Sequence, residues 1–152
     1  MGLYAITTVG IINNAEELVA QYFSDHGHQF MAMSSGKVNS TELAAALINQ
    51  ADDLVSGIRH AQAKIDGSCT MLLLTADGII AARHALGRLP CWWARGQDGC
   101  CVSFESFAYH KLGYHDAYEL GPGRSAEGHP HRLGDLSPAG TNARSAPSCR
   151  TY

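Results

Sequence analysis

Several features that would place this chain in a special class of proteins are missing from its sequence. It has no apolar run near the roughly 20 residues that a membrane-spanning helix needs. Its net charge is −3, and it has no basic stripe that would indicate nucleic-acid binding. The N-terminus has no charged segment ahead of an apolar one, so no signal peptide is predicted, and Ile6 stands where a myristoylation signal has Ser or Thr. The sequence therefore predicts a cytoplasmic protein with no membrane or nucleic-acid partner.

The cysteines lack the spacing of a disulfide framework or a zinc site. They are Cys69, Cys91, Cys100, Cys101 and Cys149. Their number is odd, and no two of them form a Cys-x-x-Cys pair. Buried free thiols are therefore expected. His26 and His28 have no third ligand beside them, so no metal site is predicted.

What the sequence does contain is typical of one globular domain. The chain has 152 residues, of which 45% are hydrophobic and 16% charged. Residues 3–9 are rich in β-branched and aromatic side chains and predict a strand. Gly10 is expected to turn the chain, and Asn13-Asn14 with an acid three positions on is expected to cap a helix that ends at Gly27. Turns of this kind can direct backbone N–H groups at an anionic substrate.

Two more helices and then a series of short strands are predicted. Asn39 and Glu42 form a capping box before the second helix, and the third is expected from about Asp53 to Asp66. The apolar run CTMLLLT predicts a strand covered on both faces. Short strands with hairpin-like turns follow, so the pattern indicates an α+β fold.

The composition changes at Arg124. From there the only large aliphatic residues are two leucines, and Arg, Pro, Gly, Ser and Ala dominate. Such a segment cannot bury enough apolar surface to offset its ordering entropy. It predicts a disordered tail over residues 124–152 or, alternatively, out-of-frame translation of GC-rich DNA.

Three stretches occur in the order typical of one family. They are TTVGIINNAEEL, DGIIAARHALGRLPCWW and CVSFESFAYHKLGYHDAYELGPG. Together they resemble the amidophosphoribosyltransferases, specifically the second part of the N-terminal class-II glutamine amidotransferase domain. The resemblance implies a partial Ntn-hydrolase-type αββα sandwich with mainly antiparallel sheets. Residues 1–123 would be an incomplete domain of this type, truncated at its start.

The resemblance also implies a reaction and its partners. In that family an N-terminal cysteine attacks the side-chain amide of glutamine, and its own α-amine is the base. The ammonia then displaces pyrophosphate from phosphoribosyl pyrophosphate in a separate phosphoribosyltransferase domain, in purine biosynthesis. Glutamine and that missing domain are the implied partners, and a homo-oligomer is left open. No cofactor is expected on this chain, since Mg²⁺ would belong to the other domain.

The family's glutamine site maps onto two positions here, Gly10 and Ser40, as candidate substrate-binding residues. The family's Asn-Gly pair, which stabilises the oxyanion, reads Val9-Gly10, so one side-chain donor is lost. In that family an acidic residue holds the α-ammonium of the substrate, and its position falls at or beside Ser40 here. The serine hydroxyl can hydrogen-bond the ammonium but cannot neutralise its charge. His84 stands in the place of an aspartate that usually follows the arginine after the central hairpin in that family. The simpler interpretation is that Gly10 is a turn glycine and Ser40 a helix-start residue.

No catalytic residue is predicted. Chemistry of this class needs a thiol on the first residue, but the chain begins Met1-Gly2 and its first cysteine is Cys69. The expectation is therefore a fragment of an amidotransferase that is inactive by itself, and whether the chain is an enzyme stays uncertain. The alternatives are a non-catalytic ligand-binding or regulatory module, or a pseudogene product.

Overall fold

The structure is a computed structural model that describes residues 2–26, 33–34, 37–97, 99–129 and 132–135. The helices are α1 (Ala15–His26), α2 (Ser40–Ile48), α3 (Leu54–Lys64) and α4 (Ser106–His110). The strands are β1 (Tyr4–Ile12), β2 (Met33–Ser34), β3 (Lys37–Val38), β4 (Gly67–Thr75), β5 (Ile79–Ala82), β6 (Trp92–Arg95), β7 (Cys100–Ser103), β8 (His115–Glu119), β9 (Ser125–His129) and β10 (Arg132–Asp135). Over these ranges, none of the helices combines the length and the apolar character needed to cross a membrane.

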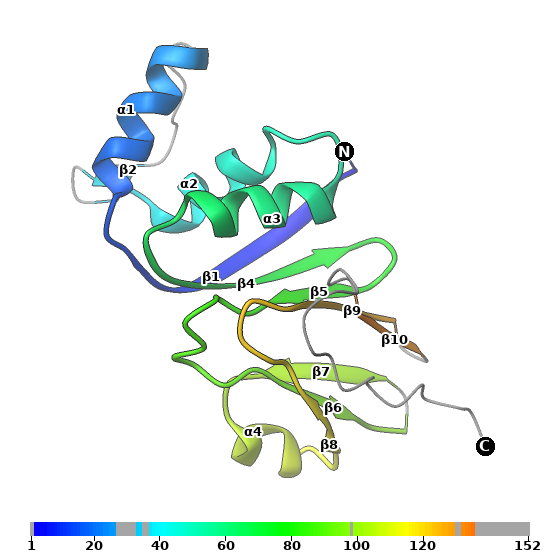
Figure 1. Ribbon diagram of the computed structural model, residues 1–152. Coiled ribbons are helices and arrows are strands. Elements are labelled where there is room, and N and C mark those ends of the chain that lie inside the picture. The colour runs from blue at the N-terminus through cyan, green and yellow to red at the C-terminus, as the bar shows by residue number, and fades with distance from the viewer. Residues whose placement is uncertain (1, 27–32, 35–36, 98, 130–131, 136–152) are drawn as a thin grey trace.

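Five strands form the main sheet, and two helices cover one of its faces. The strand order is β1-β4-β5-β9-β10, with antiparallel pairing throughout. Helices α2 and α3 lie over this sheet, as Figure 1 shows. The core between them includes Leu43 and Ile48 of α2, Ile58 of α3, and Met71 and Leu73 of β4, all at most 1% exposed. Burial of these aliphatic side chains holds the helices on the sheet.

A second sheet packs against the other face. Its strand order is β7-β6-β8, and a second apolar core lies between the two sheets. That core joins Ala81 and Ala126 of the main sheet to Trp93 and Leu120, all at most 1% exposed. Helix α4 contacts β7 and β8 at the bottom of Figure 1. The layers therefore follow the order helix, sheet, sheet, helix, with mainly antiparallel sheets.

The expectation that the CTMLLLT strand is covered on both faces holds for only part of β4. Cys69, Met71 and Leu73 belong to the core under the helices, whereas Leu72 packs against the core between the sheets. Leu74, in contrast, is 58% exposed. The second sheet therefore does not cover the end of β4.

Local capping chemistry sets the starts of α2 and α3. The Thr41 N–H donates to Oδ1 of Asn39 at 2.8 Å, and the Ser56 N–H donates to Oδ1 of Asp53 at 2.9 Å. Each bond satisfies one of the four N–H groups that a helix start leaves without an intrahelical partner. The predicted starts of these two helices are confirmed.

The strand at the N-terminus runs further than predicted. β1 passes through Gly10 and ends at Ile12, so the expectation of a turn at this glycine is wrong. Backbone pairing with β4 continues through Gly10, whose partner is Cys69, to Ile12, whose partner is Gly67. Pairing with the distant strand β4 therefore sets the end of β1. Glycine is tolerated inside a strand where the backbone of the partner strand approaches closely.

Asn14 stands at the start of α1, but its side chain does not cap that helix. Its carbonyl oxygen accepts the first helical bond, from the Leu18 N–H at 3.0 Å. Its side-chain Oδ1 accepts from the Asp66 N–H and its Nδ2 donates to the Lys64 carbonyl, both at 2.9 Å. The Asn13 N–H donates to the Asp66 carbonyl at 2.7 Å. This pair of asparagines therefore ties the β1–α1 turn to the α3–β4 connection.

The chain remains ordered beyond the expected boundary at Gly123. β9 follows directly and pairs with both β5 and β10 inside the main sheet. Ser125 and Ala126 are 4% and 1% exposed. The expectation of a tail from Arg124 onward is therefore wrong for β9 and β10. Main-chain pairing and the burial of Ser125 and Ala126 hold β9 in the sheet although it has few aliphatic residues. Residues 136–152 lie outside the described residues.

Candidate functional site

The two candidate binding positions lie on elements that meet. The Oγ1 atoms of Thr8 on β1 and Thr41 on α2 are 2.7 Å apart, within hydrogen-bonding distance. Gly10 follows Thr8 on the same strand, and the exposed Ser40 precedes Thr41 at the first position of α2. We call this region, residues 8–10 and 39–41, the β1–α2 junction. Because a helix start carries partial positive charge, the junction can accept a polar or anionic group of a ligand.

Gly10 has a clear structural role in this arrangement. Its φ is +145°, and a Cβ placed on it would lie 1.6 Å from the Ser68 carbonyl oxygen. Gly67 on the partner strand has φ +129°, and a Cβ there would lie 2.2 Å from the Ile11 carbonyl oxygen. Both glycines therefore allow β1 and β4 to approach more closely than side chains would permit. The part of Gly10 in substrate binding stays a prediction.

Val9 offers the junction no polar group. Successive side chains of a strand point to opposite faces, so Val9 lies on the face away from Thr8. Its side chain is 40% exposed, and that of Ile11, which shares its face, is 71% exposed. The loss of the side-chain donor inferred from the sequence therefore leaves an apolar residue at this position.

The described cysteines have the character of structural thiols. Cys69 pairs with Gly10 in the strand ladder, but it is 2% exposed and belongs to the core under the helices. Burial raises the pKa of Cys69 and of Cys91 to about 11. Burial also raises the pKa values of Cys100 and Cys101. Because the thiolate is the nucleophile, these four thiols are not activated at neutral pH. In the described parts of the chain, no three His, Cys, Asp or Glu side chains gather as a metal site.

Arg83 organises the segment RHALGRLP between β5 and β6, a role that sequence reasoning missed. Its Nη1 donates to Glu119 Oε1 at 3.1 Å and to the Leu120 carbonyl, and its Nη2 donates to the Gly87 carbonyl at 2.8 Å. The residue is only 7% exposed. These bonds fasten the motif to the end of β8. An arginine directly after the apolar run IIAA was the available signal, since a buried guanidinium needs partners.

His84 lies beside Arg83, where burial favours its neutral form. It is 5% exposed, and its Nδ1 accepts a hydrogen bond from the Leu86 N–H at 3.2 Å. Burial, followed by the positive charge of Arg88, lowers the pKa of His84. Its carbonyl accepts from the Gly87 and Gly123 N–H groups at 2.9 and 3.1 Å. The histidine therefore fills a structural position at the base of the loop.

Comparisons with known proteins agree with the resemblance drawn from the sequence. No protein-family model matches the chain. A curated amidophosphoribosyltransferase from Archaeoglobus fulgidus is 29% identical over 125 residues, which cover 82% of this chain and 27% of the relative. The chain thus spans about a quarter of the curated relative that it matches.

Solved structures show the same fold. Glutamine phosphoribosylpyrophosphate (PRPP) amidotransferase from B. subtilis, complexed with ADP and GMP, matches with a TM-score of 0.75 and 23% identity, over 90% of this chain and 30% of that one. A structure described as the allosteric regulatory enzyme of purine biosynthesis matches with a TM-score of 0.75 and 22% identity, over 88% and 28%.

These matches confirm the α+β fold class, a partial Ntn-hydrolase-type αββα sandwich. The ADP and GMP named for the B. subtilis structure are ligands of that protein, and the matched part is only 30% and 28% of the two solved chains. The chain is therefore similar to part of an amidophosphoribosyltransferase in sequence and to part of these two solved structures in fold.

Proposed function

We propose that this chain is a segment of the glutamine amidotransferase domain of an amidophosphoribosyltransferase-like protein and does not hydrolyse glutamine on its own. In the whole protein, glutamine hydrolysis would supply ammonia for the formation of phosphoribosylamine from phosphoribosyl pyrophosphate, in purine biosynthesis. The observation that carries the proposal is the β1–α2 junction. There the strand with Gly10 and the helix start with Ser40 meet through the Thr8–Thr41 contact of 2.7 Å.

The junction supports binding better than it supports chemistry. An exposed serine at a helix start can hydrogen-bond an ammonium or a carboxylate of glutamine. A reaction would also need an activated thiol, and the described cysteines are protonated at neutral pH because burial raises their pKa values. Val9 stands where the resemblance places the side-chain donor of an oxyanion site, and the loss of such a donor typically lowers kcat by about 10² to 10³. The segment would therefore contribute part of the substrate-binding frame.

The proposed partners and localisation follow from the same similarity to amidophosphoribosyltransferases. The partners would be glutamine and a phosphoribosyltransferase domain, and association into a homo-oligomer is compatible with the relation. We place the protein in the cytoplasm. The four described cysteines form no disulfide, which agrees with a reducing compartment.

The first experiment restores the missing charge at Ser40. In the Ser40→Asp variant, a carboxylate at the start of α2 would pair with the α-ammonium of glutamine. An exposed pair of this kind contributes about 0.5–1 kcal/mol, so we expect L-glutamine to bind about two- to fivefold more tightly by calorimetry. Glutaramic acid, which lacks the α-ammonium, should show no such gain.

A matched control is available on another helix. Ser106 is an exposed first residue of α4, so Ser106→Asp adds the same charge at the same helical position, away from the junction. It should leave glutamine affinity unchanged. Equal affinities in Ser40→Asp, Ser106→Asp and the unmodified protein would show that Ser40 is not at a glutamine site. Release of ammonia from glutamine by the unmodified chain would refute the proposed inactivity.

A further inference from the structure

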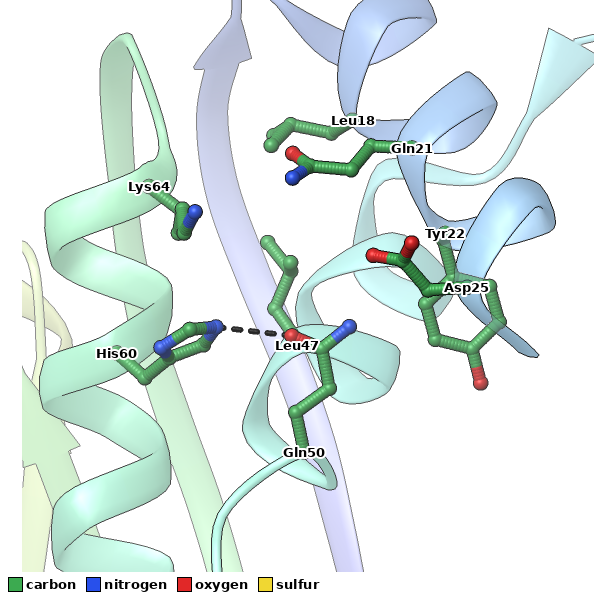
Figure 2. A pocket seen from close by; sticks show the side chains of 8 residues that line it. All are labelled: Leu18, Gln21, Tyr22, Asp25, Leu47, Gln50, His60 and Lys64. Carbon is green, nitrogen blue, oxygen red and sulfur yellow. Dashed lines mark hydrogen bonds between the residues drawn. The ribbon is translucent and has the colours of Figure 1, made fainter.

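A pocket lies between helices α1, α2 and α3. Its volume is about 320 Å³, and its walls come from α1, α2 and α3. Figure 2 shows its side chains, with those of α1 on one side and those of α3 on the other. Ligand pockets commonly measure about 300–1,000 Å³, so this one fits a small molecule.

The pocket has an apolar base that is already packed. Leu18 of α1 and Leu47 of α2 line it, and they are only 5% and 3% exposed because they also belong to the core under the helices. A ligand would therefore meet a formed surface. This base can receive an aliphatic side chain but offers no hydrogen bond.

Two side chains of opposite charge line the walls. Asp25 comes from α1 and Lys64 from the end of α3, and Figure 2 shows them on different sides of the pocket. Both are exposed, and within the described part of the chain neither has an ion-pair partner within 4.0 Å. A ligand that carries both an ammonium and a carboxylate can pair with both side chains.

The third polar group is an oriented amide. His60 of α3 and Gln50, just beyond α2, form a hydrogen bond of 2.8 Å between Nε2 and Oε1. When Nε2 donates, Oε1 is engaged and the amide NH₂ of Gln50 can donate elsewhere. Figure 2 shows this nitrogen on the side of Gln50 toward α1. The amide therefore adds a donor that suits a carboxylate.

We propose that this pocket binds a free zwitterionic α-amino acid with an aliphatic side chain. The carboxylate would lie against Lys64 and the Gln50 amide, the ammonium against Asp25, and the side chain against Leu18 and Leu47. The site is separate from the β1–α2 junction. Thr41 stands at the first turn of α2 and Leu47 at its last, so the two positions are about 9 Å apart along the helix axis. The inference does not depend on the proposed function.

The ligand chemistry can be tested with three probes that differ by one charge. L-Leucine carries both charges, L-leucinamide lacks the carboxylate, and 4-methylpentanoate lacks the ammonium. Titrating each into the ¹⁵N-labelled full chain should give saturable shifts for L-leucine at about millimolar concentration, centred on α1, Gln50 and the end of α3. Each one-charge analogue should bind about two- to fivefold more weakly, since one charged contact is lost. Absence of saturable L-leucine shifts in the folded protein would overturn the proposal.

Variants assign the two charges. Asp25→Asn and Lys64→Gln should each weaken L-leucine binding about two- to fivefold. Asp52→Asn and Lys111→Gln make the same changes at exposed positions outside the pocket and should have no effect. All four sites are exposed, so circular dichroism should show a retained fold. Equal effects in pocket and control variants would refute the assignment.

Discussion

Replacing Asn14 by alanine should destabilise the fold through contacts that are distant in sequence. The substitution removes two side-chain bonds of 2.9 Å, to the Lys64 carbonyl and from the Asp66 N–H. A neutral hydrogen bond contributes about 0.5–1.5 kcal/mol net, and water can reach this surface, so the expected loss is about 1–3 kcal/mol. The first helical bond, from the Leu18 N–H to the Asn14 carbonyl, uses only the backbone and remains.

Two further variants separate the two bonds and control for position. Asn14→Asp keeps an acceptor for the Asp66 N–H but places a carboxylate oxygen against the Lys64 carbonyl, so it should lose at least half of the stability lost in Asn14→Ala. Asn13→Ala alters the neighbouring exposed asparagine, whose backbone bond to Asp66 stays intact. It should change the free energy of unfolding by less than about 0.5 kcal/mol.

Urea unfolding followed by circular dichroism measures these differences. In thermal melts, a loss of 1 kcal/mol lowers Tm by about 2–4 °C in a domain of this size. If Asn14→Ala and Asn13→Ala unfold at the same urea concentration, the Asn14 bonds contribute nothing in solution. The account of how the β1–α1 turn is held would then be wrong.

Three further outcomes are expected. Leu43→Ala should lower the free energy of unfolding in urea by about 2–5 kcal/mol because Leu43 is 1% exposed. Leu74→Ala, at a 58% exposed position, should lower it by less than about 1 kcal/mol. Similar losses in the two variants would refute the assigned core. Because the folded pKa of His84 lies below its ordinary value, its neutral form stabilises the fold above about pH 6.5, and this contribution should be lost as the pH falls below that value. Urea midpoints at pH 7.5 and 5.5 should therefore differ less in His84→Asn than in the unmodified protein, and an unchanged pH dependence would count against the histidine. Cys69 and Cys91, 2% and 0% exposed, should resist a thiol reagent until urea unfolds the protein, and labelling mapped by mass spectrometry in native buffer would contradict their burial.

The sequence predicts well what is decided locally. Asn39 and Asp53 cap helices through bonds to residues two and three positions away, so their pattern is visible in a short window. The fold class followed from three spaced stretches that together resemble one family, and the structural matches confirm it. Capping and ordered motifs therefore carried most of the correct predictions.

What the sequence did not predict depends on distant partners. The strand through Gly10 continues because Ser68 and Cys69 lie opposite it, and the first asparagine pair was interpreted as a cap because its bonds to Lys64 and Asp66 are invisible locally. β9 has few aliphatic residues, so its composition predicted a disordered tail. It is a strand because it pairs with β5 on one side and β10 on the other. Tertiary context decides such segments over local composition.

The position of β9 in the main sheet has a consequence for folding kinetics. Ile80 of β5 pairs with Glu127 of β9, so the second sheet and α4 all lie in the loop that this pairing closes. β1 likewise cannot pair until β4 is in place, since Thr7 pairs with Leu72, which is distant in sequence. Topologies dominated by such non-local pairings fold slowly, in roughly milliseconds to seconds, while α2 and α3 can form early because their contacts are local. Until β9 arrives, β5 presents an unpaired edge, and an intermediate stopped at that stage would be open to pairing with another chain.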